Sequence, residues 1–340
     1  MKNTVLGLCL GLIIAFAQAG DLLSLKAGHP QTYVVTKGDT LWAISGLFLN
    51  DPWFWPELWY YNPQVENPHL IYPGDVLKLM WVDGKPVLVR GGANNSVVKL
   101  TPQMRISDIN EAIPVIPQDV IAPFLTRSRV VSEGELEQAP YVLAGKRGNI
   151  VAGAGDQVLG RGDFSGDETY GVYRRGQVYK DPVTGEALGV EATDIGTAKL
   201  LATEKDVATL ILNRSTQEIR GADRFFPMER GRLYARFEPK MPVENSSGFI
   251  IAVEGGLTQI GSLNVVTLNL GDRDQLEAGD VLAIYSRGEE VTDPITNERI
   301  KAPDIRSGVL MVFRSFERVS YALVLNAEQS LKVGDVVKNP

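Results

Sequence analysis

The side chains that most often carry enzyme chemistry are scarce in this 340-residue chain. It has one cysteine, Cys9, and two histidines, His29 and His69, none spaced with other ligands as a metal site requires. Segment 163–168 is acidic but lacks the spacing of a calcium loop, and no two carboxylates form a convincing acid–base pair. We therefore expect no catalytic residue, no metal site and no cofactor, and a chain that is not an enzyme.

Two segments of the chain are rich in turn-forming residues. They read Gly-Asp-Thr-Leu-Trp at 38–42 and Asn-Pro-His-Leu-Ile-Tyr-Pro at 67–73. Asp39 or Thr40 is also a suitable N-cap for a helix that starts at Leu41. Capping is the favoured interpretation of Asp39, and ligand contact is the alternative.

The elements that would position these turns are a strand, a helical segment and a second strand. Leu41, Ile44 and Phe48 recur at helical spacing and are predicted core residues. The predicted strand residues of the same core are Val34, Val76 and Leu77. Gly74 precedes the second strand, where a turn requires its freedom.

This strand–helix–helix–strand pattern, from Thr32 to Leu79, closely resembles a LysM module. That family binds the N-acetylated sugars of peptidoglycan and chitin in a shallow groove between the two turns. The resemblance implies that backbone groups of the facing turns pair the N–H and C=O of the N-acetyl group while an apolar floor takes its methyl. The resemblance implies peptidoglycan glycan strands as a partner. The glycan-binding residues that it implies are Gly38, Asp39, Thr40, Leu41, Trp42, Asn67, Pro68, His69, Leu70, Ile71 and Tyr72.

An aromatic cluster departs from the ordinary LysM pattern. All five tryptophans lie in or just after this segment: Trp42, Trp53, Trp55, Trp59 and Trp81. About half of the aromatic residues are expected to fill the small core. We expect Trp53 or Trp55 to be exposed, as a surface for stacking on sugars or docking a protein.

Residues 1–19 have the features of a secretory signal: an early Lys2, a short apolar run and a small-residue cleavage site at 17–19. No other stretch is long and apolar enough to span a bilayer. The formal net charge of −7 argues against nucleic acid as a partner. The expected location is the periplasm, at the cell wall.

The remaining chain favours a multidomain α+β protein in which tandem, mostly-β barrel or sandwich-like modules follow the small βααβ domain. The expected segments are the LysM domain at 32–80, a proline-rich connector at 81–140 with a hairpin turn near Asp83, a first β module at 141–227 and a second at 228–340.

The two β modules contain an internal duplication. Segment 173–186 matches segment 285–298 at seven of fourteen positions, an offset of 112 residues. Ile-Leu-Asn at 211–213 then matches Val-Leu-Asn at 324–326, one residue later than that offset. Both long segments contain Asp-Pro-x-Thr, which favours a tight turn.

Segment 270–282, a Gly-rich turn followed by Ala-Gly-Asp and an apolar strand, resembles the C-terminal domain of the flagellar assembly protein T family. An export signal, a LysM module and this domain in that order resemble the type IV pilus secretin-associated family. The resemblance implies an anchor that tethers the outer-membrane secretin ring of the pilus machine to peptidoglycan.

Two alternatives stay open. LysM modules often accompany catalytic domains, so the chain could be a peptidoglycan hydrolase or an activator of one. The C-terminal resemblance alone would fit a structural protein of a flagellar outer ring.

Overall fold

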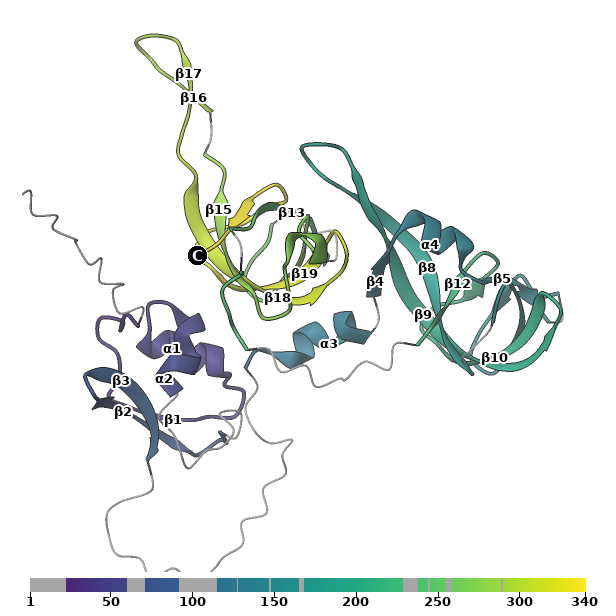
Figure 1. Ribbon diagram of the computed structural model, residues 1–340, viewed down its shortest axis with the longest axis horizontal. Coiled ribbons are helices and arrows are strands. Elements are labelled where there is room, and N and C mark those ends of the chain that lie inside the picture. Colours follow the sequence, from purple (N-terminus) through teal and green to yellow (C-terminus); the bar gives the residue numbers. More distant parts are fainter. Residues whose placement is uncertain are drawn as a thin grey trace, which may run out of the picture. The chain divides into compact units, whose positions relative to one another are not determined.

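The computed structural model describes residues 23–59, 71–91, 115–126, 128–146, 148–164, 168–228, 238–243, 245–254, 259–288 and 290–340. The chain divides into two compact units, Met1–Ile113 and Pro114–Pro340 (Figure 1). The expected signal at 1–19 lies outside the described residues. Within these ranges no helix has the length and apolar character needed to cross a membrane.

The first unit is a three-stranded antiparallel sheet with short helices. Its elements are β1 (Thr32–Val34), α1 (Leu41–Phe48), the 3-10 helix η1 (Pro52–Phe54), α2 (Trp55–Trp59), β2 (Val76–Val82) and β3 (Lys85–Gly91). The sheet order is β1-β2-β3. Asp83 and Gly84 have φ values of 50° and 78°, which confirms the predicted hairpin turn. Because β3 pairs with β2 along its whole length, residues 85–91 belong to this sheet and not to a connector.

The core of the first unit follows most of the predicted pattern. Leu41, Ile44 and Phe48 are buried, as their helical spacing predicted. Val34, predicted to be a core residue, is 54 % exposed, whereas Val35 is only 2 % exposed. Successive side chains of an extended segment point to opposite sides, so burying Val35 turns Val34 outward.

The first part of the second unit is a barrel of six strands. They are β5 (Tyr141–Gly145), β7 (Gln157–Arg161), β8 (Thr169–Lys180), β9 (Ala187–Glu204), β10 (Val207–Ser215) and β12 (Arg224–Pro227). Their pairing runs β5-β7-β10-β9-β8-β12 and returns to β5. Four further elements accompany the barrel: β4 (Ser128–Val131), which pairs with β9, α4 (Glu133–Gln138), and the small pair β6 (Val151–Ala152) and β11 (Ile219–Arg220).

The second part is another closed barrel, with strand order β13-β14-β19-β18-β15-β20. Its strands are β13 (Ser247–Val253), β14 (Val265–Leu268), β15 (Val281–Ser286), β18 (Ile305–Ser315), β19 (Ser320–Ala327) and β20 (Val336–Lys338). A 3-10 turn, η4 (Asp272–Asp274), and an outlying hairpin of β16 (Glu290–Thr292) and β17 (Arg299–Lys301) complete it. This arrangement agrees with the predicted mostly-β C-terminal region.

The two barrels have the same strand connectivity and matching registers. Ala198 pairs with Leu212 in the first barrel, and Leu310 pairs with Val324 in the second, an offset of 112 on both strands. In the opening strands the offset is 108: Val142 pairs with Gly160, and Ile250 with Leu268. The second barrel therefore repeats the first, with four additional residues after its second strand.

The register corrects one detail of the predicted alignment. In β10 the pairing skips from Leu212 to Arg214, and in β19 it skips from Val324 to Asn326. These matching bulges keep the offset at 112, so Leu212 corresponds to Val324. The predicted alignment, which placed Ile-Leu-Asn against Val-Leu-Asn one residue later than the offset, is therefore wrong. Neighbouring apolar residues in these strands are similar to one another, so the sequences alone did not reveal the correct register.

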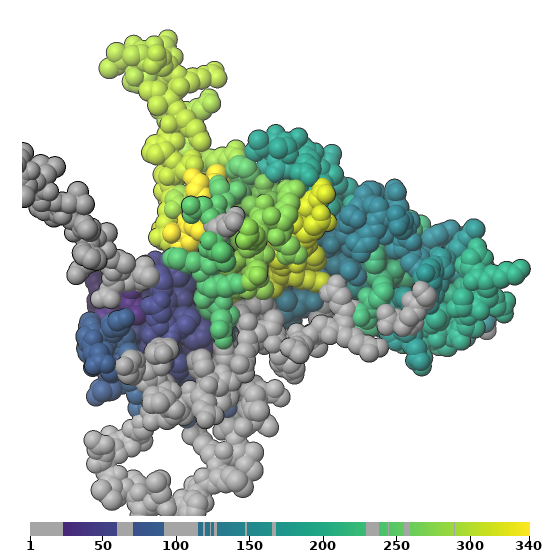
Figure 2. Space-filling model, in the orientation of Figure 1, coloured from purple at the N-terminus to yellow at the C-terminus, as the bar shows by residue number. Residues whose placement is uncertain are grey.

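The β8–β9 hairpin connects the two barrels. Tyr179 and Leu188, near its tip, are each 5 % exposed, and both belong to a cluster with Val319 of the second barrel. Ile251, Ala252 and Phe316 pack against the same cluster. The outlying β16–β17 hairpin of the second barrel instead stands out as a narrow arm (Figure 2).

Candidate functional site

The strand end that leads into the first predicted recognition turn is bonded to the residues that come just before β2. The N–H of Val35 donates to the carbonyl of Asp75 at 2.9 Å, and the N–H of Gly74 donates to the carbonyl of Val35 at 2.8 Å. The adjoining ladder pairs Val34 with Val76. These bonds hold the turn that precedes β2 against the strand end that leads into the turn at 38–42.

Asp39 closes the first turn. Its carboxylate accepts from the N–H of Thr36 at 2.7 Å and from the hydroxyl of Tyr33 at 2.9 Å. Gly38, with φ of 98°, supplies the left-handed conformation that the turn requires. Burial raises the pKa of Tyr33, and the hydrogen bond to Asp39 adds to that effect. Asp39 thus stabilises the turn itself and is not the helix cap.

Thr40 is the N-cap of α1. Its backbone is extended, and its hydroxyl accepts from the N–H of Ala43 at 3.1 Å. The first N–H groups of a helix have no hydrogen-bond acceptor within the helix. In α1, two of these N–H groups belong to Leu41 and Trp42. The partial positive charge of a helix start favours an acceptor there. These two donors suit the carbonyl oxygen of an acetamido group.

Asp75 closes the second turn. Its carboxylate accepts from the N–H of Tyr72 at 2.9 Å and lies 2.8 Å from the guanidinium of Arg90 on β3. Its side chain is buried, so the ion pair with Arg90 offsets the cost of placing this charge inside. Gly74 has φ of 94°, which confirms that the turn needs a glycine there. The described parts of the two turns, residues 36–39 and 72–75, are therefore each closed by an aspartate of their own.

The predicted site residues divide into a floor and a rim. The side chains of Thr40, Leu41 and Trp42 are buried but keep 3–8 % of their surface exposed, so they can form only the floor of a groove, whereas Ile71 is fully covered at 0 %. Gly38 is exposed, and Asp39 and Tyr72 are half-buried, so these can form the rim. Asn67, Pro68, His69 and Leu70 lie outside the described residues. Glycan contact by all of these residues stays a prediction.

The aromatic cluster is mostly core. Trp53 is 6 % exposed and Trp55 is 3 % exposed, so the expectation that one of them is exposed is wrong. A small domain has few large residues with which to fill its interior, and the short helices η1 and α2 direct these rings inward. Trp81 is the exposed tryptophan, at 64 %. It lies near the end of the seven-residue β2 opposite the recognition turns, so it is no part of the groove.

A metal centre finds no support in the part of the chain that the structure describes. No group of three or more His, Cys, Asp or Glu side chains there is placed to hold a metal ion.

Comparison with known proteins identifies the first unit. Residues 33–79 match the LysM domain family. An uncharacterized protein, YqbP of Bacillus subtilis (strain 168), is 38 % identical over 60 residues, which cover 15 % of this chain and 27 % of the relative. The chain thus spans little more than a quarter of that relative's length. The LysM domain supports peptidoglycan binding and an association with the cell wall.

Proposed function

We propose that this chain, whose residues 33–79 form a LysM domain, is a non-enzymatic periplasmic anchor that tethers the type IV pilus secretin ring to peptidoglycan. The observation that supports glycan binding is the pair of backbone hydrogen bonds that join Val35, at the end of β1, to Gly74 and Asp75, just before β2. The secretin half is supported by the order of the domains and by the resemblance of segment 270–282 to the flagellar assembly protein T family.

The glycan would be recognised through its acetamido groups. The N–H groups of Leu41 and Trp42 can donate to the acetyl carbonyl, and the side chain of Trp42, which is 8 % exposed, can offer apolar surface to the methyl group. Because Asp39 and Asp75 close the described parts of the two turns, little ordering entropy should be lost at these residues on binding.

One such contact would be weak. A shallow groove that binds in the micromolar to millimolar range supplies roughly 4–8 kcal/mol. Many copies arranged around a ring would hold far more firmly, because each bound module raises the effective concentration of the others. The proposed role as an anchor therefore depends on display of the domain in many copies.

The test of glycan binding is retention of the chain on purified sacculi, with two matched aromatic variants. Tyr72→Ala removes a rim side chain while the backbone of the turn keeps its bonds to Asp75. Trp81→Ala removes an exposed ring far from the groove. We expect Tyr72→Ala to lower retention and Trp81→Ala to leave it unchanged. Equal retention of both variants and the parent chain would count against the groove.

The secretin half is tested by crosslinking in cells through a reporter residue on the barrels. Capture of the pilus secretin would support the proposal, whereas capture of flagellar basal-body proteins would favour the outer-ring alternative. Zymography on murein tests the hydrolase alternative, and a clearing band would overturn the non-enzymatic role.

A further inference from the structure

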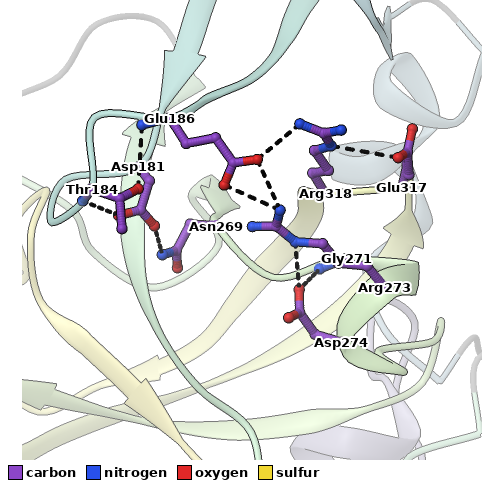
Figure 3. A network of polar contacts seen from close by, with 9 residues as sticks. All are labelled: Asp181, Thr184, Glu186, Asn269, Gly271, Arg273, Asp274, Glu317 and Arg318. Atoms are coloured by element: carbon purple, nitrogen blue, oxygen red, sulfur yellow. Dashed lines mark hydrogen bonds and ion pairs between the residues drawn. The ribbon is translucent and has the colours of Figure 1, made fainter.

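The tip of the β8–β9 hairpin presents two carboxylates to the second barrel (Figure 3). Asp181 closes its own turn by accepting from the N–H of Thr184 at 2.8 Å. Its other oxygen accepts from the side-chain amide of Asn269 at 2.7 Å. Glu186 binds two guanidinium groups, that of Arg318 at 2.8 Å and that of Arg273 at 3.3 Å. These contacts and the buried Tyr179–Leu188 cluster dock the hairpin of one barrel on the next.

The β16–β17 hairpin of the second barrel ends in the same turn. Asp293 accepts from the N–H of Ile295 at 2.7 Å and from that of Thr296 at 3.3 Å, as Asp181 does at the corresponding positions. Asn297, with φ of 62°, replaces the left-handed Gly185. Among the described residues, the Asp293 and Glu298 side chains make no contact outside their own hairpin.

The apolar residues of the docked hairpin also have counterparts. At the offset of 112, Val291 stands where Tyr179 does, and Ile300 stands where Leu188 does. Tyr179 and Leu188 are each 5 % exposed, but Val291 is 56 % exposed and Ile300 is 51 % exposed. The second hairpin therefore keeps the apolar side chains of a docking element, and within the described residues no element covers them.

The first barrel keeps most of the apolar docking floor. Ile251, Ala252 and Val319 belong to that floor in the second barrel, and their counterparts in the first are Leu143, Ala144 and Val207. A fourth floor residue, Phe316, has the charged Glu204 as its counterpart. Leu143 is 44 % exposed, and no hairpin of the described chain covers this floor.

The polar contacts of the first barrel differ in part. Arg161 stands where the second barrel has Asn269, so the acidic turn of Asp293 would meet a guanidinium in place of an amide. Asp206 stands where Arg318 does and lies 3.3 Å from Arg161. The Glu186–Arg318 contact is therefore not repeated, and the match rests on the apolar floor and on Arg161.

We propose that the β16–β17 hairpin of one copy docks on the first barrel of a second copy, repeating between molecules the contact that joins the two barrels within the chain. The hairpin and the floor lie on different barrels, so the contact is heterologous: it closes into a ring or continues as a filament according to the rotation that it imposes. This self-association is independent of the proposed glycan binding.

The first experiment measures self-association of the full chain by sedimentation velocity up to the millimolar range. We expect concentration-dependent oligomers. The double variant Val291→Asp/Ile300→Asp and the single variant Leu143→Asp should each weaken association at least tenfold. The control Val243→Asp alters an equally accessible side chain, 82 % exposed and on neither surface, and should associate like the parent chain. Circular dichroism checks that every variant is folded.

The second experiment mixes the hairpin variant with the floor variant. Each retains the surface that the other has lost, so the mixture should form one-to-one dimers and nothing larger. A monomeric parent chain, undiminished association of the hairpin variant, or a mixture without dimers would each overturn the proposal. Docking of the hairpin on a different protein but not on a second copy would also overturn it.

Discussion

At the scale of single residues, adjacent polar side chains stabilise different parts of the predicted recognition turns. Asp39 closes a turn through Thr36 and Tyr33, whereas Thr40 caps α1 through Ala43. Asp75 does for the second turn what Asp39 does for the first, with Arg90 balancing its buried charge. The residues that shape the site are thus occupied by one another, which leaves backbone groups and the rim for a ligand.

Replacing Thr40 with alanine should destabilise the first unit. The substitution removes the cap on the N–H of Ala43, and loss of such a cap costs about 1 kcal/mol. For a domain of this size that corresponds to a fall in Tm of about 4–8 °C. All five tryptophans lie in the first unit, so tryptophan fluorescence reports its thermal unfolding alone. Thr40→Ser, which keeps the hydroxyl, should melt like the parent chain.

Glu191 should make the barrels more stable as the pH falls below neutral. Burial raises the pKa of its carboxyl, and the nearby Glu254 carboxylate raises it further, whereas a hydrogen bond from Gln177 opposes the shift. The folded chain binds the Glu191 proton more tightly than the unfolded chain does. The loss of folding stability that the ionised Glu191 causes is therefore fully present above the folded pKa. It fades as the pH drops from that pKa toward the ordinary glutamate value.

The measurement is urea unfolding of the chain, followed by circular dichroism between pH 7 and pH 5. Glu191→Gln should raise the free energy of unfolding at pH 7 and reduce its increase toward pH 5. A variant less stable than the parent chain at pH 7 would contradict the argument.

At the scale of elements, the barrels are joined by more than chain connectivity. Helix α3 (Gln118–Thr126) precedes the first barrel in sequence, yet its Phe124 ring packs edge-on against Phe313 and Tyr321 of the second. Arg314 of β18 donates to the carbonyl oxygens of Phe124 and Leu125 at the end of this helix. The cation satisfies carbonyl groups that a helix end leaves unpaired. Together with the β8–β9 hairpin, α3 links the two barrels.

The apolar cluster should contribute more to hairpin docking than the ion pairs do. Leu188→Ala empties a site that is 5 % exposed and should cost about 2 kcal/mol or more. Arg318→Ala removes a partly exposed partner of Glu186 and should cost at most about 1 kcal/mol. Urea unfolding by circular dichroism compares the two variants. An Arg318→Ala variant less stable than Leu188→Ala would reverse this ranking.

At the scale of the whole molecule, a sugar-binding domain type and a pair of repeated barrels occupy separate compact units. Such a division allows one unit to bind the wall while the other binds protein. The two proposed activities should therefore be separable, so that each can be removed without the other. The proposed anchor needs both units on one chain, but neither unit should need the other to fold.

Cutting the chain between the units should separate these activities. A protease site inserted between Gly91 and Val115 lies between the last strand of the first unit and the first described residue of the second. After cleavage, the tryptophan-detected melting of the first unit should be unchanged, and sacculi should retain that fragment but not the barrels. Loss of the melting transition on cleavage would show that the units depend on each other.

Patterns local in the sequence were enough to predict the start of α1 after Thr40, the hairpin at Asp83 and the repeated turns at 181–186 and 293–298. Each depends on a few neighbouring residues with restricted backbone or side-chain preferences. The glycan-binding residues were inferred from family resemblance, and the structure adds which of the described ones are buried and which are exposed.

Only the tertiary structure decided which apolar residues are covered. It buried Val35 and exposed Val34, enclosed Trp53 and Trp55 while leaving Trp81 in solvent, and kept the barrel register at 112 through matching bulges. It also covered one hairpin tip and left its repeat bare. These outcomes depend on contacts between residues that are far apart in the chain. Segments with similar local sequences do not show which of these contacts form.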